Sequence, residues 1–321
     1  RGALYSPAGN RLLGVRRCAT PGCATLPGAG VDAIRARLLE SIDGLAAELC
    51  GGRPAGPVVV GFAGPVDGHG TVLAAPTVWG GDASAFPLGG ALQARWPQAR
   101  VRVVNDVTAA GYRYLRGPGD DLVVVTVSSG IGHKVFVDGR PVVGRAGRGG
   151  EIGHLRMCDA ADAPLCECGG RGHLGALGSG RATPWQVRRL AREDPVGFFD
   201  SALCAPSAGD PRRVDNPMLI AAFREGDDWA ARVVERMARP LGQALAAIHQ
   251  AVGSERFVLV GGFALALGPA YASRVARSAA DACWCLGMDW DSAVELGEPD
   301  DDAGLIGGGR LAAILDAGDG R

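Results

Sequence analysis

The chain has 321 residues, with 33 basic and 34 acidic side chains, a formal net charge of −1 and 47% hydrophobic residues. This balance excludes a basic nucleic-acid-binding tail, and the length and apolar share predict a globular protein with two domains. The only lysine is Lys134, so no Gly-Lys-Ser/Thr segment and no Walker A phosphate loop is present. The uncharged run Phe257–Ser273 contains glycine and proline and is too short for a bilayer span, so no membrane contact is expected. The nine cysteines, odd in number and unevenly spread, favour a reducing, cytoplasmic compartment.

In chain order, hydrophobic patterning predicts alternating strands and helices in two α/β halves, with a break near residues 106–121. The first half is expected to contain strands at Gly2–Ser6, Leu12–Cys18, Pro57–Phe62 and Val101–Val104, and helices over 30–50 and 106–115. The second half is expected to contain strands at Leu122–Val127, Lys134–Val137 and Phe257–Val260, a loop over 156–183, and a mainly helical region over 184–250. Pro240 is expected to kink the helix over 228–250, and a last helix is expected over 303–315.

Four metal-ligating side chains lie within twenty residues: His154, Cys166, Cys168 and His173. Two thiolates and two imidazoles suit a closed tetrahedral zinc site, and the glycines between them allow a tight turn around one ion. The alternatives are a loop with free thiols and surface histidines, or a site in which Cys158 is a ligand. Because four protein ligands leave no open position for water, the expected Zn²⁺ is structural.

A polar pair, Asn105-Asp106, follows the buried strand at Val101–Val104. Ligands of α/β sheets gather at the carboxyl ends of strands, where an Asp can accept a proton from a hydroxyl. The alternative is that Asp106 only caps the following helix. From these residues alone, the capping role would be preferred.

Two further strands end in glycine turns. Ser128-Ser129-Gly130-Ile131-Gly132 follows one apolar strand, and Gly261-Gly262 ends another. Adjacent backbone N–H groups in such turns can hold an anion, such as a phosphate group. A hairpin turn and a helix start explain the two segments equally well.

Taken in order, these motifs resemble those of the ROK family of repressors, open-reading-frame proteins and sugar kinases. The resemblance covers nearly the whole chain, and its most specific part is Glu151-Ile-Gly-His154 with the Cys-x-Cys loop. It implies an α/β, actin-like ATPase (ribonuclease H-like) fold, in which two α/β domains flank a cleft. The expected domains are a smaller one over 1–107, joined by a C-terminal helix over 303–321, and a larger one over 108–302 with a zinc loop at 154–173.

The resemblance implies that the chain is an ATP-dependent, Mg²⁺-requiring kinase, often dimeric in the family, that phosphorylates an exocyclic C6- or C7-type hydroxyl. Asp106 would be the general base. The implied acceptor ligands are Gly64, Thr77, Asn105, Asp106, Glu151 and His154, the last also binding zinc through its other nitrogen. The implied nucleotide ligands are Ser129, Gly130, Gly132, Gly261 and Gly262.

The chain departs from the family pattern at several positions. Ser129 replaces the usual Thr, Thr77 replaces the Asn of a Pro-Asn pair, and His173 replaces a third cysteine. His133 and Lys134 replace glycines, and Lys134 is expected either to contact phosphate or, preferably, to face water from a strand. Gly175 replaces the Glu that reaches the anomeric end of the sugar.

The loss of that carboxylate predicts a glucose-like acceptor with an altered C1–C2 region, either an amino sugar or a carbocyclic C7-cyclitol. Glucose and other hexoses remain alternative acceptors of a glucokinase-like enzyme. From a different class, the alternatives are a ligand-sensing transcription regulator of the same family or a non-catalytic sugar-binding protein. The Asp-x-Gly-Gly-Thr loop that opens ROK kinases is absent before Arg1, which favours truncation or renumbering over a degenerate kinase.

Overall fold

The computed structural model describes residues 1–81 and 83–318, and its contacts divide the chain into two compact units. Unit 1 comprises Arg1–Asp120, Phe136–Gly150 and the described residues from Asp300 onward; unit 2 comprises Asp121–Val135 and Glu151–Pro299. This division differs from the expected boundary after residue 107, which falls inside helix α4 (Asp106–Tyr114). Since α4 packs along helix α13 (Ala303–Asp316), both helices belong to unit 1. Residues 319–321 of the expected C-terminal helix lie outside the described residues.

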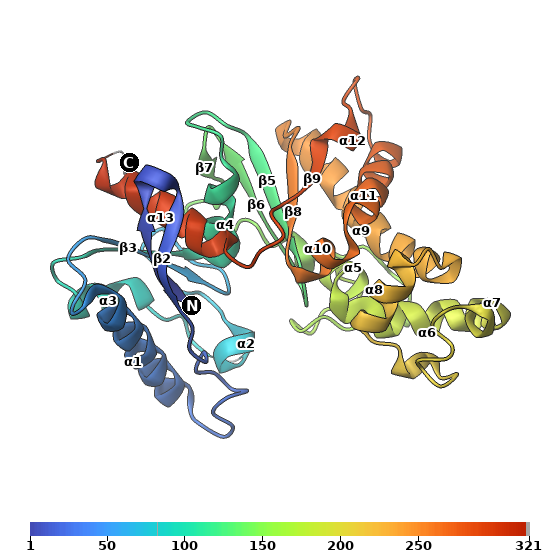
Figure 1. Ribbon diagram of the computed structural model, residues 1–321, viewed down its shortest axis with the longest axis horizontal. Coiled ribbons are helices and arrows are strands. Elements are labelled where there is room, and N and C mark those ends of the chain that lie inside the picture. The colour runs from blue at the N-terminus through green and yellow to red at the C-terminus, as the bar shows by residue number, and fades with distance from the viewer. Residues whose placement is uncertain (82, 319–321) are drawn as a thin grey trace. The chain divides into compact units, whose positions relative to one another are not determined.

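Unit 1 contains an antiparallel hairpin, a parallel strand pair and helices on both sides of that pair (Figure 1). Its further elements are β1 (Gly2–Ser6), β2 (Arg11–Arg16), α1 (Val31–Cys50), β3 (Pro57–Phe62), α2 (Pro76–Trp79), α3 (Leu88–Arg95), β4 (Arg100–Asn105) and β7 (Arg140–Pro141). In the parallel pair, Phe62 of β3 lies opposite Asn105 of β4, so the carboxyl ends of both strands meet at one edge.

The alternation of side chains along β4 explains how unit 1 is layered. Val103 points to one face, where it joins a core formed with Ile34 and Leu38 of α1 and Leu92 of α3. The residues of β4 on either side of Val103 point to the other face. On that other side, α13 packs against β3, β1 and α4.

Three consecutive glycines, Gly307–Gly309, allow α13 to approach its neighbours closely. A Cβ on Gly307 would lie 1.8 Å from the carbonyl oxygen of Ala109 in α4, and one on Gly309 would lie 2.2 Å from the ring of Tyr5 in β1. A Cβ on Gly308 would meet only Val59, at 3.6 Å, which is an ordinary contact. Glycine is therefore a steric requirement at the first and third of these positions.

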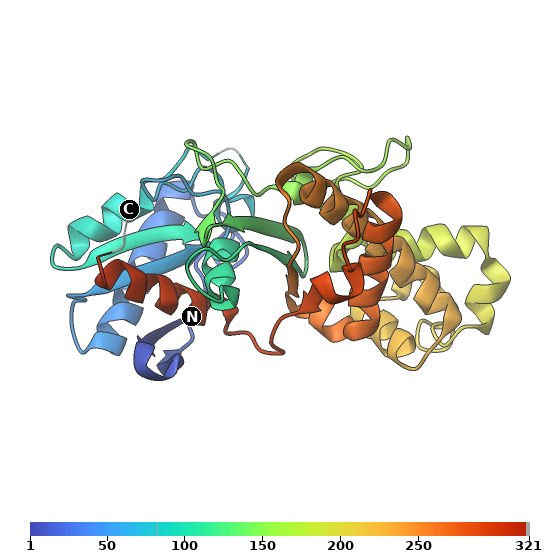
Figure 2. The ribbon, with the colours of Figure 1, turned by 90° about the horizontal axis from the view of Figure 1, so that it is seen from above.

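Unit 2 is a sheet covered mainly by helices (Figure 2). Its strands are β5 (Leu122–Val127), β6 (Ile131–Val137, which continues into unit 1), β8 (Phe257–Val260) and β9 (Val294–Leu296). They lie in the order β6-β5-β8-β9, and β8 is parallel to both of its neighbours. Its helices are α5 (Leu174–Gly178), α6 (Thr183–Glu193), α7 (Pro195–Asp200), α8 (Asn216–Arg224), α9 (Asp228–Val252), α10 (Gly262–Leu267), α11 (Pro269–Ala282) and α12 (Trp290–Ala293).

The core of unit 2 lies between the sheet and the packed pair α9 and α11. Gly242 of α9 permits their close approach, because a Cβ there would lie 2.5 Å from the carbonyl oxygen of Val275 in α11. Helix α9 continues past Pro240. Among the described residues, no helix is both long enough and apolar enough to cross a membrane.

Most of the expected elements form, but three expectations were wrong. The expected loop over 156–183 contains the short helix α5, whose Leu174 and Leu177 are buried. Strand β6 begins at Ile131 instead of Lys134. Lys134 does not face water, because its side chain is only 2% exposed.

The glycine run in α13 supplies an internally controlled stability test. We expect Gly307→Ala and Gly309→Ala each to lower the free energy of unfolding by about 2 kcal/mol or more, because a methyl group would overlap backbone or ring atoms. Gly308→Ala should be neutral or stabilising by up to about 1 kcal/mol, since alanine favours helix and the site has space. Urea denaturation of the three variants measures this, and equal effects at all three positions would contradict the packing described.

Candidate functional site

In unit 1, the candidate site lies where β3 and β4 end, and Asn105 organises it. The Asn105 Nδ2 donates to the carbonyl oxygen of Gly64 at 3.0 Å and to Asp106 Oδ1 at 3.0 Å. Its Oδ1 accepts hydrogen bonds from the backbone N–H groups of Val107 and Thr108. Asn105 is therefore the N-cap of α4, a role that the capping alternative had given to Asp106.

Asp106 is the first residue of α4, and its side chain is exposed. Its Oδ1 accepts hydrogen bonds from the Val107 N–H at 2.9 Å and from Asn105 Nδ2. Because the same oxygen is held by a helix N–H and by a neighbouring amide, the carboxylate has a defined direction. The arrangement provides an oriented, solvent-accessible proton acceptor at a strand end.

The backbone around Gly64 is closed to larger residues. Gly64 has φ +126°, and a Cβ there would lie 2.2 Å from the carbonyl oxygen of Ala74. The segment before α2 thus touches the Gly64 turn, and Thr77 lies three residues further on, exposed in α2. The structure brings Gly64, Asn105 and Asp106 together by hydrogen bonds, whereas the side chain of Thr77 forms none within the described part of the chain.

In unit 2, the two expected nucleotide segments are neighbours, because β5 and β8 are parallel and Thr126 lies opposite Val260. Gly261 has φ +95°, and a Cβ there would lie 2.7 Å from the Val127 carbonyl oxygen. The Ser128–Gly130 turn is closed by a bond from the Ser128 N–H to the Gly130 carbonyl oxygen, at 2.9 Å. Two glycine turns from distant parts of the sequence therefore lie side by side.

The segment after α5 supports the first of these turns. The Ser179 Oγ donates to the carbonyl oxygen of Ser129 at 3.0 Å, and the Gly180 N–H donates to that of Ser128 at 2.8 Å. Around Gly130 a Cβ would meet nothing within 4 Å, so the tip of the turn is open to a ligand. Gly132, by contrast, is the second residue of strand β6.

Glu151 is paired with the one lysine of the chain. Lys134 Nζ lies 3.7 Å from Glu151 Oε1, and the lysine side chain is 2% exposed against 38% for the glutamate. A buried ammonium requires a partner, so Lys134 holds the carboxylate of Glu151 at the end of β6. The neighbouring His133 is also buried, and its Nδ1 lies 3.3 Å from the Ile152 N–H, which donates to it. Sequence patterning missed this pair, since an isolated lysine in a strand resembles an exposed residue.

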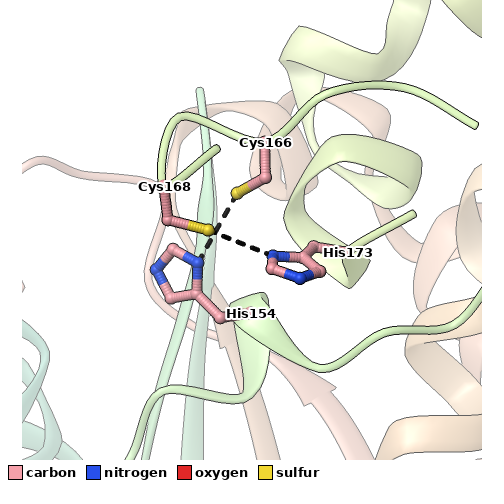
Figure 3. A group of neighbouring side chains, drawn as sticks. All are labelled: His154, Cys166, Cys168 and His173. Atoms are coloured by element: carbon pink, nitrogen blue, oxygen red, sulfur yellow. Dashed lines mark hydrogen bonds between the residues drawn. The ribbon is translucent and has the colours of Figure 1, made fainter. Parts of the chain in front are cut away.

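The side chains of His154, Cys166, Cys168 and His173 converge on one point (Figure 3). Their ligand atoms all lie within 4.8 Å of one another. Cys166 Sγ is 3.5 Å from His154 Nδ1, and Cys168 Sγ is 3.3 Å from His173 Nδ1. In a tetrahedral zinc site, Zn–S and Zn–N bonds of ordinary length place such atoms about 3.5 Å apart. The donor set and its spacing fit Zn²⁺, and Cys158 is not a member of the group.

The backbone around this cluster is shaped by glycines. The Cys166 N–H bonds the Gly170 carbonyl oxygen at 2.7 Å, which closes a tight turn around the Cys-x-Cys pair. A Cβ on Gly170 would lie 2.2 Å from the His173 ring. Gly172 has φ +67° and would place a Cβ 1.9 Å from the Cys158 carbonyl oxygen. The glycine-rich composition of the loop thus has a steric cause.

The same cluster connects the loop to the Glu151 segment. Glu151 directly precedes one 3₁₀ turn, Ile152–His154, and His154 is the last residue of that turn. The ring of His154 presents Nδ1 to the cluster and its other nitrogen away from it (Figure 3). Gly175 lies against this turn, since a Cβ there would be 3.3 Å from the Gly153 carbonyl oxygen. A side chain at position 175 would therefore begin in tight contact with the middle residue of this turn, and glycine avoids that contact.

A family model described as the ROK family matches residues 31–313. Among curated proteins, the "C(7)-cyclitol 7-kinase" of Streptomyces hygroscopicus subsp. jinggangensis is 42% identical over 305 residues, covering 93% of this chain and 86% of that protein. The "2-epi-5-epi-valiolone 7-kinase" of an Actinoplanes species is 34% identical, covering 86% of this chain and 77% of that protein.

Among solved structures, a ROK family glucokinase from Streptomyces griseus in complex with glucose and AMPPNP has a TM-score of 0.72 and 25% identity. The match covers 97% of this chain and 95% of that chain. Such neighbours have the actin-like ATPase fold, so the expected fold class is confirmed.

The metal cluster yields a test with a matched control. We expect Cys168→Ser to reduce bound zinc from about one equivalent per chain to well under half and to lower the melting temperature, because a ligand thiolate is lost. Cys158→Ser removes a neighbouring thiol outside the cluster and should leave both quantities unchanged. Metal analysis and thermal melts of the purified variants measure this, and the assignment fails if Cys158→Ser loses zinc or the parent chain binds none.

Proposed function

The chain belongs to the ROK family and is a phosphotransferase with an alcohol acceptor, and we propose that it transfers the γ-phosphate of ATP to the exocyclic C7-type hydroxyl of a C7-cyclitol. One observation carries the proposal: the Asn105-mediated hydrogen bonds that hold Asp106 at the joint end of two parallel strands. The names of the relatives favour a kinase over the regulator and non-catalytic alternatives.

In this proposal Asp106 is the general base. Its carboxylate accepts the proton of the acceptor's exocyclic hydroxyl as the oxygen attacks phosphorus. Asn105 fixes the direction of that carboxylate, because all of its amide donors and acceptors are engaged by Gly64, Asp106 and the start of α4. The Gly64 turn, which accepts the Asn105 amide bond, completes the acceptor-binding side of unit 1.

The nucleotide is assigned to the two adjacent glycine turns of unit 2. The open tip at Gly130 and the backbone at Ser129 suit phosphate oxygens, and Gly261-Gly262 provides the neighbouring surface. ATP with Mg²⁺ supplies the transferable phosphoryl group and neutralises its charge. Ser179, by bonding the Ser129 carbonyl oxygen, keeps the first turn in its shape.

Glu151 and His154 are assigned to the ring hydroxyls of the acceptor. Lys134, which is buried, orients the more exposed Glu151 through their ion pair. The metal cluster holds His154 by Nδ1, so the other ring nitrogen is directed to the acceptor. A zinc ion in the cluster would thus fix the tautomer and orientation of a substrate ligand, without taking part in phosphoryl transfer.

The choice of acceptor rests on Gly175 and on the relatives' names. The space beside the Glu151–His154 turn holds no carboxylate at position 175, so a ring with an altered C1–C2 region loses no contact there. Two relatives at 42% identity are each named a C(7)-cyclitol 7-kinase. An acceptor with a cyclitol ring and one exocyclic hydroxymethyl group satisfies both observations.

The general-base assignment is tested by Asp106→Asn, which keeps the shape and the Oδ1 acceptor of the side chain but removes the basic oxygen. We expect ADP release with a C7-cyclitol acceptor to fall at least 10³-fold, while the melting temperature changes by less than about 2 °C. Asp32→Asn, at an exposed carboxylate in the first turn of α1, is the control and should retain full activity. Comparable activity of the two variants would contradict the assignment.

The role of Lys134 is tested by Lys134→Met, which keeps the chain length and removes the charge. We expect KM for the acceptor to rise about tenfold, because Glu151 loses the group that orients it, while KM for ATP stays within twofold. Arg192→Met, at an exposed cation on α6, controls for net charge. A rise in KM for ATP equal to that for the acceptor would indicate general damage and would refute the assignment.

A further inference from the structure

Unit 1 contains a cavity to which the proposed reaction assigns no residue. The cavity has a volume of about 990 Å³ and lies among β4, the C-terminal end of α4, the turn between β6 and β7, and α13. Asp106 is at the N-terminal end of α4, whereas Tyr112 near the other end of the helix and Leu115 just after it line the cavity. The volume is at the upper end of the range for small-molecule sites.

The charged residues that line this cavity are mostly positive. Four arginines line it, Arg102, Arg116, Arg140 and Arg310, against a single acidic residue, Asp138. The nearby Arg100 and Arg113 pair with Asp316 and Asp300. No described carboxylate forms an ion pair with Arg102, Arg116 or Arg140, and all three side chains are exposed. The cavity therefore has an excess of positive charge that the protein itself does not neutralise.

One of these cations is fixed in place. Arg310 Nη1 donates to the carbonyl oxygens of Arg113 at 2.5 Å and Leu115 at 3.1 Å, and its Nε donates to Asn10 Oδ1 at 3.0 Å. These acceptors are neutral, so they hold the guanidinium without cancelling its charge. A preorganised cation costs less conformational entropy when it binds an anion.

Two other arginines, Arg102 and Arg140, line the cavity together with the phenol-bearing Tyr112. Tyr112 is half-buried and lines the cavity. Burial raises the pKa of its hydroxyl, while the guanidinium groups of Arg102 and Arg140 act in the opposite direction. Arg102 belongs to β4 and Arg140 to β7, and both residues line the cavity together with Tyr112. Arg102 Nη1 also donates to the carbonyl oxygen of Gly68 at 3.3 Å, an acceptor without formal charge.

The remaining wall is apolar. Val104 of β4 and Leu311, Ile314 and Leu315 of α13 line it, and Ile314 is 39% exposed. A ligand with anionic groups and a carbon body would match both kinds of lining. Guanidinium groups recognise phosphate oxygens through paired N–H donors, and more than one cation favours more than one phosphate.

We propose that this cavity is a binding site for a small organic bisphosphate. The bound phosphates face Arg102, Arg116 and Arg140, with Arg310 as the fixed cation, and the carbon body lies against α13. The site is independent of the reaction assigned to Asp106, and the helix α4 connects the two.

The test is isothermal titration of the full chain with fructose 1,6-bisphosphate as the probe, in the presence of saturating AMPPNP and Mg²⁺. We expect one site per chain, weakened at least tenfold by the double variant Arg116→Ala/Arg140→Ala. The control double variant Arg53→Ala/Arg192→Ala removes two exposed cations elsewhere and should bind within twofold of the parent chain. Equal binding by the two double variants, or no binding by the parent chain at millimolar probe, would overturn the proposal.

A second variant tests the charge argument by a gain of affinity, which misfolding cannot mimic. Asp138 has φ +51° in the β6–β7 turn, a conformation that asparagine also tolerates. Asp138→Asn removes the one carboxylate of the cavity and should tighten probe binding about threefold. Unchanged or weaker binding by this variant would count against the site.

Discussion

The side chain of Asn105 joins three elements of unit 1. Its amide nitrogen bonds the Gly64 turn after β3, and its oxygen caps α4, while it ends β4 itself. The position of Asp106 follows from these bonds, because the carboxylate belongs to the helix that Asn105 caps. Parallel pairing of β3 and β4 is the precondition, since only then do both strand ends reach the same edge.

Parallel strand pairing also positions the candidate site residues of unit 2. Parallel pairing of β5 and β8 brings the Ser128–Gly130 turn beside Gly261. The cluster of His154, Cys166, Cys168 and His173 brings the Cys-x-Cys loop against the turn that follows Glu151, and a zinc ion bound there would hold the two together. Lys134 then supplies from inside the sheet the charge that Glu151 requires.

The fold and much of the candidate site could be predicted from the sequence, because strand patterning and the order of motifs are local features. The grouping of the four candidate metal ligands was predictable for the same reason, since they lie within twenty residues and the structure brings all four together. The burial of Lys134 could not be predicted, because its partner is seventeen positions away and only the sheet brings the two together. The cap assignment at Asn105 also needed coordinates, since Asn and Asp are equally good N-caps. The steric need for glycine at 307 and 309, but not at 308, depends on tertiary neighbours that patterning does not identify.

The central claim is that the acceptor is a C7-cyclitol. The most direct measurement is the ratio of kcat/KM values for a valiolone-type cyclitol, glucose and N-acetylmannosamine, determined with one preparation by coupled ADP release. We expect the cyclitol to be preferred by at least tenfold, with the phosphate on the exocyclic oxygen. Glucose or the amino sugar as the better acceptor would contradict it.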